Sequence, residues 1–426
     1  AAGPGFLRHG AREQGRKNTG GGAKRRVNFT ARVRVDKSAE WAEMFGDAWR
    51  TMKYRFYDPK MHGFDWDAAR AKYQPLVEFI GDRQELLNIV NEMIGELNAS
   101  HTGAAPPPGG AREGAAQTRH LGVELTPDES SGRFKVAYVY EEGPADKDWA
   151  RLKTGDYILA IDGKPLTTND NVWKMLSNTL NRRVTLTVNN KPTDDGSWKT
   201  RIDPVTTAAY NQLRYQRWVN DRKEIAKKLS NGRVGYLHIQ AMDQPSLRKF
   251  EKELRENRDK EALVIDQRFN GGGNIEQELL GILVQRQYQV WQPRGTESTS
   301  RPLSGFFGPK IVLQNWRSAS NAEMFPAGFR ALGLGKVVGT PTMGAVIGTG
   351  SYSLIDGSTV RTPGVGVYLA DKGQTNMENY GVQPDILVEN TPEDNLAGRD
   401  RQLETAVQEV LKELKTPGSS LKADAR

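Results

Sequence analysis

The 426-residue sequence contains no cysteine and only five histidines. The absence of cysteine excludes disulfide bonds, thiolate metal sites and cysteine nucleophiles, although it leaves the redox compartment open. No run of about 18 apolar residues occurs, so we expect no transmembrane helix and no membrane partner. Hydrophobic residues make up 37% and charged residues 26%, which is typical of a globular protein. The length favours two to four domains.

A basic surface is also missing over most of the chain. The formal net charge is +8, but residues 1–26 carry seven Lys or Arg and a single acid. This Gly-rich lead-in, taken as residues 1–29, is typical of a linker. Because the rest is nearly neutral, we expect no nucleic-acid partner. With no initial Met and no signal-peptide core, we expect the C-terminal part of a longer polypeptide. We expect it in the cytoplasm, or in the cell envelope if an upstream signal was removed.

Residues 30–103 predict a small helical domain. The stretch "SAEWAEMFGDAWRTMKYRFY" places an apolar side chain every three or four positions, with Ser38 as the expected N-cap. The stretch "DRQELLNIVNEMIGEL" repeats this pattern, and its Asp82 and Glu85 resemble a capping box. The alternation in 27–36 predicts a strand before the first helix.

A β-rich segment and then an α/β segment follow. The Pro- and Gly-containing run 104–118 predicts a linker. Residues 119–204 resemble a PDZ domain through "GDYILAIDGKPL", and such modules bind extended peptides along a strand edge. Strands and helices alternate over 205–395, which predicts a layered α/β core with parallel strands, similar to the crotonase and ClpP type. Residues 396–426 predict a C-terminal helix and tail. The predicted fold class is therefore multidomain α+β.

The strand-to-helix turn in "VLQNWRSASNAEMF" carries Ser318 and Ser320. A serine in such a turn lies at the carboxyl edge of the sheet, where the helix N-terminus favours developing negative charge. The same serines also suit ordinary helix caps, because Ser is common at that position. The segment alone leaves nucleophile and cap as open alternatives.

Three glycines, Gly271, Gly272 and Gly273, follow a predicted buried strand in "VIDQRFNGGGN". Such a turn can present backbone N–H groups to an anion or to an oxyanion. It matches neither a Walker loop nor a dinucleotide fingerprint, so it indicates no nucleotide cofactor. A plain glycine turn is the alternative.

A serine nucleophile needs a base, and the five histidines restrict the choice. His101 stands beside Ser100 where a predicted helix ends, and it is the best candidate by elimination. The other four lie in the lead-in, in the loop "DPKMHGFDWD", at the start of the PDZ-like segment and within a strand: His9, His62, His120 and His238. Pairing His101 with Ser320 requires the fold to close the helical domain onto the α/β core. Glu378, in the loop "NMENYGVQPDI", is one of 52 acids, and composition does not single it out.

Taken in order, these segments resemble the C-terminal half of the tricorn protease family, within the tail-specific or C-terminal processing serine peptidases. The resemblance covers roughly residues 30–415 and includes a helical domain, a PDZ domain and an α/β catalytic domain. The matching stretches are "EWAEMFGDAWR" with "YDPKMHGFDWDAAR", "EMIGELNASH", "GDYILAIDG", "DQRFNGGG", "NWRSASNAE", "LGLGKVVGT" and "ENYGVQPDI".

The resemblance implies a role for each residue of a Ser-His-Ser-Glu tetrad. Ser320 resembles the nucleophile and His101 the general base. Ser100 resembles the serine that links this histidine to a glutamate, and Glu378 resembles that glutamate. The resemblance also assigns the oxyanion donors to the backbone of Gly273 and Asn321, with Gly271 and Gly272 next to the substrate. It implies neither a metal nor an organic cofactor.

Two positions depart from the family pattern. Asn321 stands where the family has Asp, which removes a charge beside the nucleophile. Trp291 takes the position of an Asp that, in the archaeal type, selects substrates with basic side chains. We therefore expect a preference for apolar or aromatic side chains in the substrate. The resemblance implies a peptide or unfolded-protein substrate and a homo-oligomer, a hexamer or a smaller ring, in which a neighbour can complete the pocket.

The sequence therefore predicts a serine endopeptidase that works through an acyl-enzyme. A non-catalytic PDZ-type peptide-binding scaffold is the first alternative, which the departures at Asn321 and Trp291 keep open. An acyl-CoA enzyme of the crotonase type is the second alternative, because that fold also has a glycine-lined oxyanion site. The PDZ-like segment and the tetrad residues speak against the second.

Overall fold

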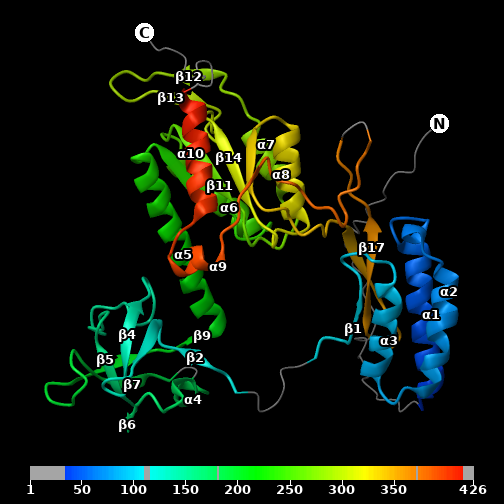
Figure 1. Ribbon diagram of the computed structural model, residues 1–426, viewed down its shortest axis with the longest axis horizontal. Helices are drawn as coiled ribbons and strands as arrows, with labels where there is room; N and C mark the ends of the chain where they lie inside the picture. Colours follow the sequence, from blue (N-terminus) through cyan, green and yellow to red (C-terminus); the bar gives the residue numbers. More distant parts are fainter. Residues whose placement is uncertain (1–33, 110–115, 180–181, 371–372, 416–426) are drawn as a thin grey trace, which may run out of the picture.

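A computed structural model describes residues 34–109, 116–179, 182–370 and 373–415. Figure 1 shows three parts: a helical part, a PDZ-like β sheet, and a parallel sheet between helices. The long helix α5 (Thr207–Ser230) runs from the PDZ-like sheet to the parallel sheet. The predicted multidomain α+β class is confirmed. In the described part of the chain, no helix combines the length and apolarity needed to cross a membrane.

The helical part packs around a core that includes Met44, Trp49 and Leu86. Its elements are α1 (Lys37–Arg55), η1 (Met61–Gly63), α2 (Trp66–Tyr73), η2 (Gln74–Phe79) and α3 (Arg83–Gly95). The expected N-cap at Ser38 is wrong, because Asp36 caps α1 and accepts a hydrogen bond from the Ser38 N–H. The strand predicted at 27–36 lies mostly outside the described residues, and 34–36 form no strand.

Asp82 caps α3 as its sequence position indicated, and it accepts from the Glu85 N–H. Glu85 departs from the capping-box pattern, since its carboxylate takes the Gly81 N–H rather than the N–H of the cap residue. Both helix starts therefore use a carboxylate to satisfy backbone donors that have no partner within the helix.

A three-stranded sheet from distant parts of the chain covers the helical part. Its antiparallel order is β1 (Ala104–Ala105), β17 (Thr359–Val365) and β16 (Gly348–Ser353). Val360 of β17 is fully buried in the helical core, and Figure 1 shows β17 alongside α1 and α3. Residues 348–365 thus extend from the α/β part into the helical part. This crossing joins the two segments that carry the predicted base and nucleophile.

The PDZ-like part is an antiparallel sheet around its own apolar core, with the order β3-β4-β5-β7-β8 and with β6 paired to β5. A short pair, β2 with β9, closes it at the chain entry and exit. Its elements are β2 (Arg119–His120), β3 (Val123–Asp128), β4 (Arg133–Val139), β5 (Tyr157–Ile161), β6 (Lys164–Pro165), α4 (Val172–Leu176), β7 (Val184–Asn189), β8 (Trp198–Ile202) and β9 (Val205–Thr206).

The third part is a five-stranded parallel sheet with the order β10-β11-β14-β15-β18. Its elements are β10 (Val234–His238), α6 (Gln244–Glu256), β11 (Ala262–Asp266), α7 (Glu276–Leu283), the hairpin β12 (Gln289–Trp291) and β13 (Thr299–Arg301), β14 (Lys310–Gln314), α8 (Asn321–Ala331), β15 (Gly335–Gly339), β18 (Ile386–Leu387), α9 (Pro392–Leu396) and α10 (Arg401–Lys415). The central strands are buried throughout, as expected when helices cover both faces.

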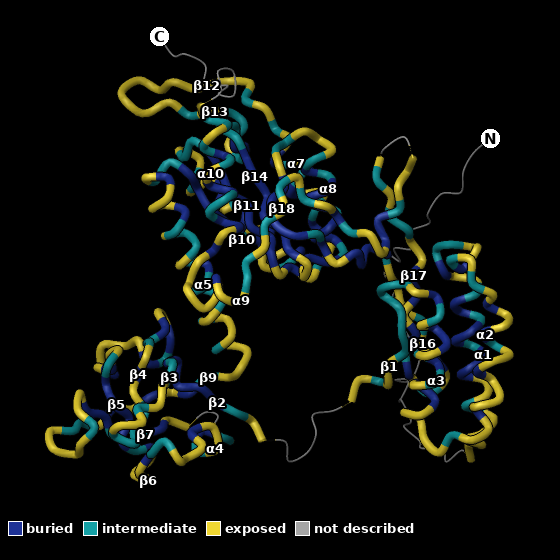
Figure 2. The backbone as a smooth tube through the Cα atoms, viewed as in Figure 1, coloured by how far each residue is buried: buried dark blue, intermediate teal, exposed yellow. Residues whose placement is uncertain are grey.

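Successive side chains of each strand point to opposite faces, and so the sheet has two cores. Leu263 and Ile265 of β11 pack with α6, α7 and α8 on one face. Val264 packs with α5 and α10 on the other. Figure 2 shows β11 and β14 buried along their length between these helices. The carboxyl ends of β11 and β14 therefore emerge from a rigid core, which is the usual place for a site in such sheets.

Candidate active site

Ser320 lies in a sharp turn between β14 and α8, directly before the first helical residue. Its backbone has φ 57° and ψ −125°, a conformation that costs a non-glycine residue on the order of 1–3 kcal/mol. The turn is held by the Ser320 N–H, which donates to the Ala345 carbonyl at 2.8 Å and to Glu323 Oε1 at 3.1 Å. This strained strand–turn–helix geometry is the one that presents a nucleophilic serine at a sheet edge. Ser318, the other serine of the turn, is fully buried, and its hydroxyl accepts from the Asn315 N–H and donates to the Gln267 carbonyl after β11.

The glycine turn after β11 lies directly against Ser320. A Cβ on Gly272 would come within 2.7 Å of both Ser320 Cβ and the Ala319 carbonyl oxygen. A Cβ on Gly273 would come within 1.9 Å of the Met242 carbonyl oxygen. These two positions need glycine for close approach as well as for their positive φ. At Gly271 a Cβ would meet open space, so no steric reason demands glycine there.

Two backbone N–H groups beside Ser320 are free to bind an oxyanion. The Gly272 N–H is occupied by Asn270 Oδ1 at 2.9 Å. In the described residues, the N–H groups of Gly273 and Asn321 donate to no protein group. Asn321 is the first residue of α8, where a backbone N–H has no partner within its helix. The donors assigned by family resemblance are thus the available ones.

Ser100, His101 and Glu378 form one connected cluster. The buried Glu378 carboxylate accepts from the Ser100 N–H at 2.6 Å and from Ser100 Oγ at 3.0 Å. It also accepts from the Val346 N–H at 2.9 Å. Ser100 Oγ lies 2.9 Å from His101 Nδ1. Because the single hydroxyl proton goes to the carboxylate, His101 Nδ1 carries a hydrogen that it donates to Ser100, and Nε2 is left with a lone pair.

The surroundings keep His101 neutral near pH 7. Burial lowers the pKa of the imidazole below its usual value, and the positive charge of Arg361 lowers it further. The negative charge of Glu378 acts in the opposite direction but is the smaller effect. A neutral imidazole with a free Nε2 can accept a proton from a nucleophile.

No hydrogen bond joins Ser320 to His101, both of which belong to the described residues. They are connected through the loop 342–346. Ala345 binds the Ser320 backbone, and the next residue, Val346, donates to Glu378. Catalytic hydrogen bonds are often long without substrate and shorten when substrate binds.

The loop 342–346 is fixed by Glu323, a residue that the sequence reasoning missed. Its fully buried carboxylate accepts from the N–H groups of Gly344 at 2.7 Å and Ala345 at 2.8 Å, and from the Thr342 hydroxyl. Burial raises the pKa of this carboxyl above its usual value. The signal was present in the sequence, because Glu three residues after a candidate cap serine is a capping-box pattern.

Asn321 directs its side chain away from the free N–H groups and toward α7. Its Oδ1 accepts from the N–H of Ile275 at 2.8 Å and from the N–H of Glu276 at 3.1 Å. Its Nδ2 donates to the Glu276 carboxylate. Ile275, which precedes α7, provides no side-chain cap, so Asn321 supplies it. Asn321, which stands where the family pattern has Asp, thus donates to a neighbouring carboxylate, which an Asp could not do.

A buried ion network anchors the strand that leads into the glycine turn. Arg268 is 1% exposed and donates to Asp266 at 2.6 Å and to Asp400 at 2.8 Å. Asp400 directly precedes α10, so the network ties that helix to β11. Asp266 and Asp400 are also buried. Because an unpaired charge in this position would be costly, the guanidinium stays paired with both carboxylates. These ion pairs therefore hold the backbone in place at the start of the glycine turn 271–273.

Trp291 lies on the exposed β12–β13 hairpin, which Figure 1 shows projecting from the α/β part. Its indole is 54% exposed, stacks on Arg301 at 4.0 Å and donates to Gln289. Within the described residues, no hydrogen bond or ring contact connects it to Ser320 or to His101. The structure brings Ser100, His101 and Glu378 together, and it places Gly272 directly against Ser320. It does not bring Trp291 to either group within one chain.

The remaining described histidines have structural partners. His238 is buried between Tyr215 and the Arg268 carbonyl, and burial lowers its pKa to about 4. His120 stacks on Tyr210 in the PDZ-like part. Among the residues that the structure describes, no group of three or more His, Asp or Glu is arranged to hold a metal ion.

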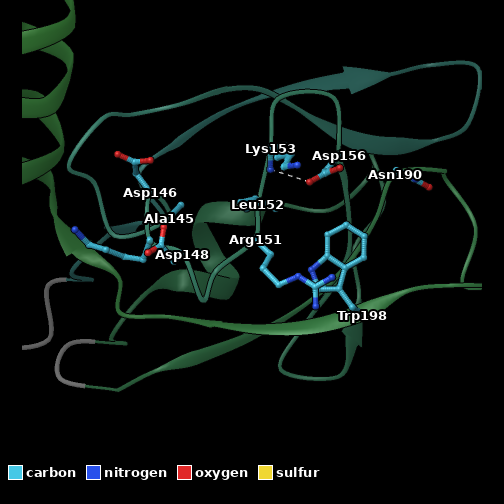
Figure 3. A pocket seen from close by; sticks show the side chains of 10 residues that line it. Ala145, Asp146, Asp148, Arg151, Leu152, Lys153, Asp156, Asn190 and Trp198 are labelled. Atoms are coloured by element: carbon cyan, nitrogen blue, oxygen red, sulfur yellow. Dashed lines mark hydrogen bonds between the residues drawn. The ribbon is translucent and has the colours of Figure 1, made fainter.

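A cavity of about 530 Å³ lies in the PDZ-like part, away from Ser320. Figure 3 shows the backbone N–H of Lys153 donating to the Asp156 carboxylate at one side of it and Arg151 next to Trp198 at the other. Charges of both signs line it, and residues 145–148 contribute to the same lining. None of the residues around Ser320 contributes to it, so this cavity is separate from the candidate active site.

Sequence comparison gives the class of this fold and site. Residues 233–388 match the family described as "Peptidase family S41". Residues 37–95 match "Tricorn protease C1 domain", and residues 120–206 match "Tricorn protease PDZ domain". In this order, the three matched segments correspond to the C-terminal region of tricorn proteases, as the sequence motifs predicted.

Individual relatives agree with this placement. "Tricorn protease homolog 1" of Streptomyces coelicolor is 33% identical over 405 residues, 91% of this chain and 37% of the relative. "Tricorn protease homolog" of Saccharolobus solfataricus is 32% identical over 394 residues, 90% of this chain and 36% of the relative. The solved "Crystal structure of the tricorn protease" is 26% identical, with a TM-score of 0.80 over 89% of this chain and 37% of that one. The chain thus spans little more than a third of the length of these relatives.

Proposed function

We propose that this chain is a serine endopeptidase that hydrolyses peptides or unfolded polypeptides. The connected cluster of Glu378, Ser100 and His101 carries the proposal, because it holds a neutral imidazole with Nε2 unprotonated and is linked through the loop 342–346 to a strained serine turn. A peptide-binding scaffold has no need of a buried carboxylate that orients an imidazole. The S41 family match supports the same reaction class.

In the proposed reaction, His101 Nε2 takes the proton of Ser320 Oγ as this oxygen attacks the peptide carbonyl carbon. The carbonyl oxygen becomes an oxyanion and is bound by the N–H groups of Gly273 and Asn321. Each such donor contributes on the order of 3 kcal/mol to transition-state stabilisation. The imidazolium then gives its proton to the leaving amine, and an ester to Ser320 remains.

Water completes the reaction by the reverse proton path. His101 takes a proton from water as the water oxygen attacks the ester carbon. The bond from this carbon to Ser320 Oγ then breaks, the imidazolium returns its proton to Ser320 Oγ, and the peptide leaves with a new carboxyl end. Ser100 and Glu378 hold the imidazole in the required tautomer and stabilise its positive charge during both steps. No metal or organic cofactor enters this scheme.

We further propose that the substrate is peptidic and that the PDZ-like part binds extended chain ends. The match of residues 120–206 to the tricorn PDZ domain supports this assignment. We also propose a closed ring of identical chains. The exposed Val290 and Trp291 of the β12–β13 hairpin support it, since a neighbouring chain would cover them and could place Trp291 in a specificity pocket.

Two measurements test the proposal. A Ser320→Ala variant should lose turnover of a fluorogenic peptide and still bind it, whereas cleavage at the wild-type rate would refute Ser320 as nucleophile. A fluorophosphonate probe should label Ser320, as read by peptide mass mapping. Labelling of Ser318 in its place would contradict the geometry described above.

A further inference from the structure

A closed ring of hydrogen bonds connects Glu378 to His62, a histidine that the proposed mechanism leaves unused. The Glu378 N–H donates to Asn376 Oδ1 at 3.0 Å, and Asn376 Nδ2 donates to the Tyr57 hydroxyl at 2.9 Å. The Tyr57 hydroxyl lies 2.6 Å from His62 Nε2, and His62 Nδ1 lies 2.8 Å from the Leu97 carbonyl. Three residues after Leu97 the chain reaches Ser100, which returns to Glu378.

The partners of this ring fix the direction of each bond. A carbonyl only accepts, so His62 Nδ1 carries the hydrogen and donates to Leu97. A neutral His62 therefore has a lone pair on Nε2, and Tyr57 donates to it. The phenol oxygen keeps a lone pair for Asn376. Every donor in the ring thus has an acceptor.

The local backbone holds His62 where it can reach both partners. His62 has φ 55°, a left-handed conformation that is uncommon for a residue other than glycine. Its N–H is bound by Asp58 Oδ2 at 2.9 Å. The imidazole packs edge-on against Phe56 and Tyr57, with ring centroids 5.0 and 5.3 Å away. The side chain is half-buried and has little freedom to leave the ring.

The ring joins the two segments that build the catalytic cluster. Leu97 precedes the segment with Ser100 and His101, and Asn376 precedes Glu378. A second connection exists on the outside, where Asn379 Nδ2 donates to the Asn98 carbonyl at 2.8 Å. The ring therefore shares the task of holding the segments together, and its loss should weaken their alignment without separating them.

We propose that His62 is a positioning residue, which acts through Tyr57 and Asn376 to set the Glu378 carboxylate against Ser100 and thereby to orient His101. The inference rests on the proposed serine peptidase function. It predicts that the ring contributes to kcat only while Glu378 is present to be positioned.

The test uses Tyr57→Phe in the full 426-residue chain, because this change removes one hydroxyl and keeps the aromatic ring. We expect kcat for a fluorogenic peptide to fall about ten-fold with KM unchanged. In a Glu378→Ala background the same change should alter kcat by less than about two-fold, because the two residues act as one unit. Tyr54→Phe, three residues earlier in the last turn of α1, is the matched control, since Tyr54 is 76% exposed. An unchanged kcat in Tyr57→Phe, or an equal loss in both backgrounds, would overturn the proposal.

A second readout needs no turnover. The charge of Glu378 raises the pKa of His101 against the effects of burial and Arg361. A looser carboxylate should therefore lower the His101 titration midpoint in Tyr57→Phe, as followed by NMR of the imidazole and assigned with a His101→Asn variant. An unchanged His101 midpoint in Tyr57→Phe would overturn the positioning role, even if the wild-type protein showed no peptidase activity. Absence of wild-type turnover with a shifted midpoint refutes only the proposed function.

Discussion

The hydroxyl of Ser100 lies 3.0 Å from the Glu378 carboxylate, although 278 residues separate them in the sequence. One residue belongs to the segment after α3, and the other to the segment before β18. The bond exists because β16 and β17 extend the α/β part along the helical part. The cluster of Ser100, His101 and Glu378 is thus a product of domain packing.

Removal of the Ser100 hydroxyl should impair catalysis more than binding. In Ser100→Ala the imidazole loses the group that fixes its tautomer, while the Ser100 N–H still binds Glu378. We expect kcat to fall by roughly 10–100-fold with KM nearly unchanged, which is less than the roughly 10²–10⁴-fold contributed by a general base, because His101 itself remains. Steady-state kinetics on a fluorogenic peptide measures this effect. Thr at position 100 keeps a hydroxyl and serves as the matched control, and equal losses in Ala and Thr would argue against the hydroxyl.

The pH dependence should report on the charges around His101. The acid limb of kcat/KM should have a midpoint below the ordinary histidine value, because burial and Arg361 both lower the pKa of His101. In Arg361→Gln a positive charge is lost, the protonated imidazole is less disfavoured, and the midpoint should move to higher pH. In Glu378→Gln it should move to lower pH.

The control for this pH shift is Arg183→Gln, which removes an exposed positive charge in the PDZ-like part. It should leave the midpoint in place. The assignment of the acid limb to His101 fails if Arg361→Gln and Arg183→Gln give the same profile. Measurement at about 0.15 M salt limits contributions from distant charges, which are screened beyond roughly 8 Å.

Adjacent glycines should respond very differently to alanine. In Gly272→Ala the new methyl group would meet Ser320 Cβ and the Ala319 carbonyl at 2.7 Å, and the residue has φ +99°. We expect a loss of activity of about 100-fold or more, because a small displacement at a reacting centre has effects of this size. Gly271→Ala places its methyl group in open space and should stay within a few-fold of wild type. Similar rates for the two variants would contradict the described turn.

The Asn321 amide should be better suited than a carboxylate to the position beside Glu276, because it can donate a hydrogen bond. Asn321→Asp puts a second carboxylate against Glu276 while it keeps an acceptor for the N–H groups of Ile275 and Glu276. We expect destabilisation of about 1 kcal/mol, comparable to the loss of a helix cap. Calorimetric melting measures it. The double variant Asn321→Asp/Glu276→Gln restores a donor and should recover most of the loss, and no recovery would show that the two side chains are not coupled.

Much of this architecture could be predicted from local sequence patterns. The apolar residues of 38–57 recur every three or four positions, which indicates a helix. The short apolar runs that form β11 and β14 are typical of buried strands. Capping was less certain, because Asp36 and Ser38 are both good caps and only the entering chain direction decides between them. Glu323 could have been found from its spacing to Ser320. Nothing local, however, distinguishes Glu378 from the other acids, or His62 from a loop histidine.

By itself, the sequence determined the order of the three parts, the strand–turn–helix around Ser320, the glycine turn and the short list of possible bases. These features depend on contacts within a few residues or on family motifs that are read along the chain. The tertiary structure alone decided that Glu378 meets Ser100, that Asn321 caps α7, that His62 reaches Tyr57 and Leu97, and that Trp291 lies on a remote hairpin. Such contacts depend on the packing of one part against another, and packing has no signature in local composition or periodicity.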